Sequence, residues 1–65
     1  MVNGSEIVRR MHNLGITQNQ LADIVAVSQA MMCYIIQGKR EPRLATIKLI
    51  SDTLGCKVDD LLMHY

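Results

Sequence analysis

The chain has 65 residues, an apolar fraction of 49%, a formal net charge of +1, and neither Phe nor Trp. A chain this short supports one compact core at most, and a core of Leu, Ile, Val, Met and Ala favours packed helices over a sandwich of sheets. The composition excludes a strongly basic protein and, without an apolar run of roughly 18 residues, a transmembrane protein.

The first predicted helix spans about residues 5 to 14. Ser5 can cap its N-terminus, and Gly15 can close its C-terminus in the left-handed conformation. Its apolar positions recur at helical spacing and are Ile7, Val8, Met11 and Leu14.

Two further helices are predicted on either side of a tight turn. The second begins at Thr17, because Thr17 and Gln20 match the capping box T-x-x-Q. Ser28 can cap a third helix that extends to about Gln37, so only two or three residues separate the two helices. The expected buried face of the second helix consists of Leu21, Ala22, Ile24 and Val25.

A polar loop at residues 39–43 separates the third helix from a fourth, predicted over about residues 44 to 54. The expected apolar face of the fourth helix consists of Leu44, Ile47, Leu49, Ile50 and Leu54. A short fifth helix is predicted over about residues 58 to 63, because Asp59 and Asp60 suit a first helical turn. The sequence therefore predicts an all-α fold, a compact bundle of five short helices in a single domain over residues 1–65.

The two cysteines and the N-terminus bear on where the protein is located. Cys33 and Cys56 lack the spacing of a metal site or of a secreted disulfide framework, and the N-terminus lacks the apolar core of a signal peptide. We therefore expect a cytoplasmic protein with reduced thiols and no bound metal.

Glycines, capping residues and apolar residues follow one another in a definite order along most of the chain. They are Gly15, Ile16, Thr17, Gln18, Leu21, Ala22, Val27, Ser28, Ile35, Gly38, Lys39, Arg40, Pro42, Leu54, Gly55, Asp59, Asp60, Leu61 and Leu62. This order resembles the phage Cro/repressor-like (XRE-type) helix-turn-helix family over about residues 5–62. The resemblance implies a lambda-repressor-like DNA-binding domain whose third helix lies in the major groove.

The resemblance also implies a role for individual side chains. The implied base-reading residues are Gln29, Ala30, Cys33 and Tyr34, and the implied phosphate-binding residues are Gln18, Ser28, Lys39, Arg40 and Arg43. Helical geometry agrees, because successive residues turn by about 100° and inward-facing Met32 and Ile35 leave the base-reading positions outward.

Four features depart from the family pattern. Ala26 stands where the tight turn usually has Gly, and because an Ala forced to a positive φ costs about 1 kcal/mol relative to Gly, we expect a slightly altered turn. Many members pair an Arg with a Glu where this chain has Met11 and Ile36, which we interpret as apolar repacking. The third helix has no Arg, Lys or Asn for bidentate base reading, and Lys57 replaces the usual capping Ser or Thr.

The implied site residues have simpler alternatives. Gln18 and Gln29 could be solvated surface residues, Tyr34 could be a partly buried core aromatic, and the basic loop could be an ordinary exposed loop. A protein-interaction module, such as a small antitoxin or coactivator, would suit the modest charge and apolar residues such as Met31. We do not expect an enzyme, because the sequence has no Ser/His/Asp set, phosphate-binding Gly loop or metal cluster.

The predicted function is a sequence-specific regulator of transcription that binds double-stranded DNA. We expect a repressor of Cro-like size that occupies a palindromic operator as a homodimer, in a bacterial or phage system and associated with the nucleoid. We expect no cofactor, small-molecule ligand or membrane partner. The expected dimer interface consists of Val58, Leu61, Leu62, Met63 and Tyr65.

Overall fold

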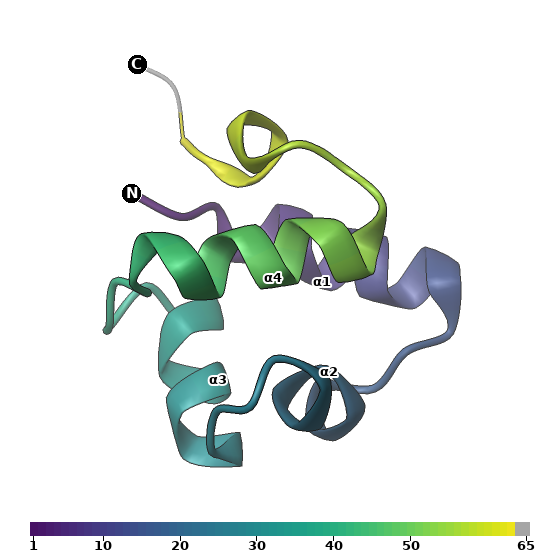
Figure 1. Cartoon of the computed structure of the whole chain (residues 1–65), viewed down its shortest axis with the longest axis horizontal. Helices are drawn as coiled ribbons and strands as arrows, with labels where there is room; N and C mark the ends of the chain where they lie inside the picture. Colours follow the sequence, from purple (N-terminus) through teal and green to yellow (C-terminus); the bar gives the residue numbers. More distant parts are fainter. Residues whose placement is uncertain (64–65) are drawn as a thin grey trace.

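The computed structural model describes residues 1–63, which form an all-helical bundle (Figure 1). Its elements are α1 (Gly4–Leu14), α2 (Gln18–Ile24), α3 (Gln29–Ile36), α4 (Leu44–Leu54) and the 3₁₀ turn η1 (Val58–Leu61). The expected fifth α-helix over residues 58 to 63 is therefore wrong, because the chain makes a single 3₁₀ turn and becomes extended at Leu62. None of the helices within residues 1–63 has the length and apolar character needed to cross a membrane.

Side-chain caps define where the first three helices begin. The Thr17 hydroxyl accepts a hydrogen bond from the Gln20 amide at 3.1 Å, and the Gln20 side chain accepts one from the Thr17 amide at 2.9 Å. The Ser28 hydroxyl caps α3 through the Met31 amide at 3.0 Å. Both predicted caps are confirmed.

The N-terminus of α1 differs from the prediction, because Asn3 and not Ser5 is its cap. The Asn3 carboxamide oxygen accepts a hydrogen bond from the Glu6 amide at 3.2 Å. The helix then begins at Gly4, whose backbone lies so close to α3 that an added Cβ would be 1.8 Å from the Ile36 carbonyl oxygen. A glycine is needed at this position because any side chain would collide with that carbonyl.

One apolar core lies between the helices. Its buried residues are Val2, Ile7, Met11, Leu21, Ala22, Val25, Met32, Ile35, Ile47, Ile50, Leu54 and Leu61. Met11 lies in this core and Ile36 packs against it, so the apolar repacking expected at these two positions contributes to the core. Five apolar residues expected on buried faces are instead exposed, namely Val8, Leu14, Ile24, Leu44 and Leu49.

The exposed residues follow from how narrow the buried faces are. The buried arc of α2 runs through Leu21 and Ala22 and continues to its C-cap residue Val25, and Ile24 lies outside it. In α4 the buried arc centres on Ile47, Ile50, Ser51 and Leu54, which leaves Leu49 on the opposite side and Leu44 at the edge.

The two ends of the described chain pair with each other. Val2 and Leu62 form an antiparallel bridge, in which the Asn3 amide donates to the Leu61 carbonyl at 2.7 Å. The Met63 amide likewise donates to the Met1 carbonyl at 2.8 Å. Figure 1 shows both ends on the side of α4 opposite to α2 and α3.

Candidate nucleic-acid interface

The turn between α2 and α3 holds the two helices close together. Val25 ends α2, and the Val27 amide donates to the Ala22 carbonyl at 3.0 Å. Ala26 between them has a φ of +60°, so the turn has a left-handed residue at this position although that residue is not Gly. An L-amino acid in this region costs roughly 1 kcal/mol or more, so the packing of α2 on α3 must offset local strain.

The predicted base-reading residues lie along the outward side of α3. Gln29 and Ala30 are exposed, and Tyr34 is 45% exposed, whereas Met32 and Ile35 are buried. Cys33 is half-buried, and its sulfur accepts a hydrogen bond from the Gln37 side-chain amide at 3.2 Å. The core-aromatic alternative for Tyr34 therefore fits poorly with its exposure.

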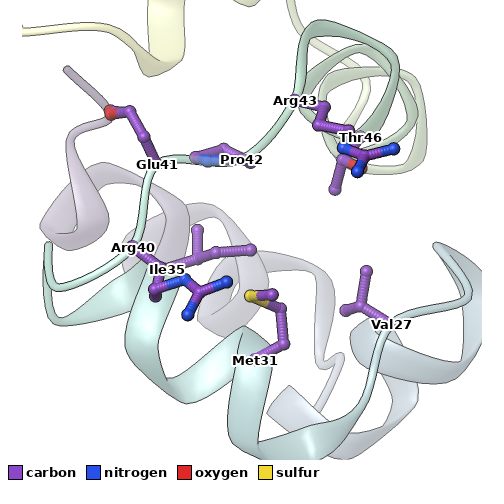
Figure 2. Close-up of a pocket in the computed structure, with 8 residues that line it drawn as sticks. All are labelled: Val27, Met31, Ile35, Arg40, Glu41, Pro42, Arg43 and Thr46. Carbon is purple, nitrogen blue, oxygen red and sulfur yellow. The ribbon is translucent and has the colours of Figure 1, made fainter.

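A cleft of about 320 Å³ separates α3 from the loop and α4. Val27, Met31 and Ile35 line the α3 side, and the loop and α4 supply Arg40, Glu41, Pro42, Arg43 and Thr46. Figure 2 shows the Arg40 side chain lying along α3 toward Met31, and the Arg43 guanidinium beside Thr46. The cleft therefore has an apolar floor and two guanidinium groups at its rim.

The N-terminus of α4 opens onto the same loop. Arg43 is the N-cap residue of α4, and no side chain caps the helix. The first turn of a helix has amide N–H groups without intrahelical partners and a positive dipole end, which favours an anion. The cleft therefore has a positive rim.

The chain has two basic clusters, Arg9 with Arg10 and the loop at residues 39–43, which differ in how far a carboxylate neutralises their charge. The Glu6 carboxylate accepts hydrogen bonds from Arg9 Nε at 2.8 Å and Arg10 Nε at 3.0 Å. The hydrogen bond from Arg9 is the main reason why the pKa of Glu6 falls from 4.5 to about 2. Glu6 therefore remains ionised at neutral pH and compensates this cluster.

The basic side chains of the loop have no such compensation. Lys39, Arg40 and Arg43 are exposed, and their side chains make no hydrogen bond or ion pair with another described residue. Their charge is thus available to an external anion. The net charge of +1 for the whole chain does not reveal this local excess of positive charge.

A helix-turn-helix family model matches residues 8–61 of the chain. The chain belongs to the helix-turn-helix family. The prediction of a phage repressor-like, XRE-type member is confirmed. The NMR structure of the DNA-binding domain of the P22 C2 repressor (1–76) is similar to this helix-turn-helix domain, with a TM-score of 0.81 and 27% identity. The similarity covers 91% of this chain and 78% of that one, and no curated protein sequence matches.

The helix-turn-helix domain does not gather all of its predicted phosphate-binding residues at one place. Arg40 and Arg43 share the cleft, whereas Gln18 is half-buried at the first position of α2. Ser28 is exposed, and its hydroxyl is already used as the cap of α3. Lys39 is exposed beyond the end of α3 and does not line the cleft.

Sequence reasoning missed Thr46 and Glu41 in this helix-turn-helix domain, although both line the cleft. A hydroxyl residue in the first turn of a helix that follows a basic loop is a signal that could have found Thr46. Glu41 also accepts a hydrogen bond from the Val2 amide, and nothing local in the sequence indicates this contact.

The Cys56 thiol is partly buried against the core, and this burial raises its pKa. Cys56 therefore stays protonated at neutral pH.

The predicted dimer surface needs a correction within residues 1–63. Leu61 is fully buried in the monomer's own core and has no surface to offer a second copy. Val58 and Leu62 are partly buried against the core, Met63 is 42% exposed, and Tyr65 lies outside the described residues. The reason is that η1 directs Leu61 inward while the extended chain at Leu62 pairs with Val2.

Proposed function

We propose that the chain is a sequence-specific regulator of transcription that binds double-stranded DNA and represses by occupying its operator. The observation that supports this most is the arrangement of charge around α3. The outward face of α3 is exposed and free of acidic residues, and two unpaired guanidinium groups line the cleft beside it. The similar solved structure described above is the DNA-binding domain of the P22 C2 repressor.

In the proposed complex, α3 enters the major groove and its outward side chains meet the base edges. Gln29 can pair with the N6 and N7 atoms of adenine, and Ala30 and Tyr34 offer apolar contact to thymine methyl groups. Lys39, Arg40 and Arg43 contact phosphates on either side of the groove and hold α3 in register. The uncapped N-terminus of α4 adds a further place for a phosphate oxygen.

We further propose that the operator is palindromic and that two copies bind it. One short helix with few base-reading side chains touches too few bases to select a single site, and two copies double the contacts. The C-terminal segment remains the proposed contact between copies, with Met63 as its most exposed apolar residue and with Val58 and Leu62 beside it.

The test is a selection of bound sites from random duplex DNA, followed by titration of the selected site at several salt concentrations. Three basic loop residues in each copy imply about six neutralised phosphates in a dimer, and hence a log–log salt slope near −5. The Arg40→Ala, Arg43→Ala double variant should have a slope shallower by about 4, because two copies lose four contacts.

Two outcomes would contradict the proposal. These are undetectable binding to duplex DNA at low salt, and an affinity that does not change with salt. Either result would favour the protein-interaction module, in which the exposed face of α3 contacts a partner protein.

A further inference from the structure

Glu41 lies in the middle of the loop that presents the basic side chains, yet its carboxylate turns away from them. Figure 2 shows the side chain leaving the cleft on the side opposite to Met31 and Val27. Its Oε1 atom accepts a hydrogen bond from the Val2 backbone amide at 2.8 Å, across 39 positions of sequence. The Met1 amino group is 3.9 Å from the same oxygen in an exposed pair, which adds little.

Within residues 1–63, the other hydrogen bonds of the loop lie near its ends. The Lys39 and Arg40 amides donate to the Tyr34 carbonyl at 2.9 and 3.3 Å, and the Arg43 carbonyl accepts from the Ile47 amide at 3.0 Å. Pro42 has no N–H group to donate. The contact between Glu41 and Val2 therefore secures the centre of the loop.

Val2 is itself a firm attachment point. Its side chain is buried in the core, and its backbone pairs with Leu62. Two residues further on, Gly4 packs against the Ile36 carbonyl at the end of α3. The N-terminal segment is therefore held at three places, by the C-terminal segment, by α3 and by Glu41.

We propose that Glu41 is a positioning residue, which anchors the loop to the N-terminal segment and so holds Arg40 and Arg43 where they meet DNA phosphates. This inference rests on the proposed function. It predicts a change in DNA affinity whose direction differs from the one that charge alone predicts. A carboxylate next to phosphate-binding arginines repels DNA, so its removal should tighten binding unless the hydrogen bond to Val2 matters more.

Two variants with the same charge separate these effects. Glu41→Gln removes the negative charge and keeps an oxygen that accepts the Val2 N–H, whereas Glu41→Ala removes both. We expect Glu41→Gln to bind the selected duplex at least as tightly as the wild type. We expect Glu41→Ala to bind about three- to tenfold more weakly, because part of the binding free energy is then used to order the loop. The salt slope of Glu41→Ala should also be shallower by about 1 than that of Glu41→Gln.

The free protein provides an independent readout. Backbone ¹⁵N order parameters of residues 39–41 should fall in Glu41→Ala and stay at the wild-type level in Glu41→Gln. Glu41 is 56% exposed and outside the core, so both variants should keep the helical circular dichroism of the wild type. Asp52→Ala is the control for net charge, because Asp52 is exposed and its side chain contacts no other described residue through a hydrogen bond or ion pair.

The outcomes distinguish this inference from the proposed function. Equal affinities and equal order parameters for Glu41→Ala and Glu41→Gln would overturn the positioning role while duplex binding by the wild type stood. A wild type that binds no duplex DNA would overturn the proposed function and the inference together. Weaker binding by Glu41→Ala alone, restored in Glu41→Gln, supports both.

Discussion

Gln29 is the outward-facing residue of α3 with the greatest capacity for hydrogen bonding to a base. It follows the capping Ser28 directly and is exposed, whereas Ala30 has no polar side-chain atom and the Cys33 sulfur already accepts a hydrogen bond from Gln37. The few polar groups on this face imply that sequence preference depends on a small number of side chains.

Gln29→Ala should therefore weaken binding to the selected operator by about 1 to 3 kcal/mol and relax the preference at one base pair in each half-site. Lys39→Ala is the matched control, because a lost phosphate contact should weaken binding to all sequences alike. Competition binding against operators with single base-pair changes measures both effects. An unchanged preference profile for Gln29→Ala would mean that other residues read the bases.

At the scale of elements, the pair α2 and α3 depends on a turn with a strained residue. Ala26 has a φ of +60°, and the turn is held by hydrogen bonds from the Ala26 amide to Asp23 and from the Val27 amide to Ala22. These bonds and the burial of Leu21 and Val25 keep the backbone in a conformation that Ala alone disfavours.

Ala26→Gly should stabilise the protein by up to about 1 kcal/mol, because relief of the left-handed strain exceeds the extra entropy of Gly in the unfolded chain. The matched control is Ala45→Gly in the first turn of α4. There the same substitution should destabilise by roughly 0.5 to 1 kcal/mol, since the backbone is right-handed. Urea denaturation measures both. A less stable Ala26→Gly would show that the entropy of the unfolded chain outweighs the strain.

At the scale of the whole molecule, the two ends of the described residues 1–63 and helix α3 lie on opposite sides of α4 (Figure 1). A contact between copies through the C-terminal segment would therefore leave α3 of each copy free to meet DNA. An isologous contact made by the few apolar residues of this segment buries little area. We therefore expect dimerisation to be weak in free solution and to be completed on the operator.

Met63→Lys should shift the complex with a palindromic duplex from two copies toward one, because a charge replaces an apolar residue at the proposed contact. Leu14→Lys is the control, since Leu14 is a similarly exposed apolar residue at the end of α1. Sedimentation equilibrium with and without the duplex measures the stoichiometry. A strictly one-to-one complex of the wild type at saturating protein would exclude the dimer.

The parts of this protein that the sequence by itself determined are those that depend on neighbours within one helical turn. The capping box of Thr17 and Gln20 and the cap at Ser28 rest on hydrogen bonds among nearby residues. The order of these local signals was also enough to identify the family and the outward face of α3.

Only the tertiary structure decided the features that join distant parts of the chain. The burial of Leu61, the pairing of Val2 with Leu62 and the approach of Gly4 to Ile36 have no local signal. Hydrophobic period indicates which face of a helix is apolar, but the neighbouring elements determine how much of that face is covered, which is why Leu49 is exposed. The Glu41 contact belongs to the same class, because two residues 39 positions apart meet only after the core has formed.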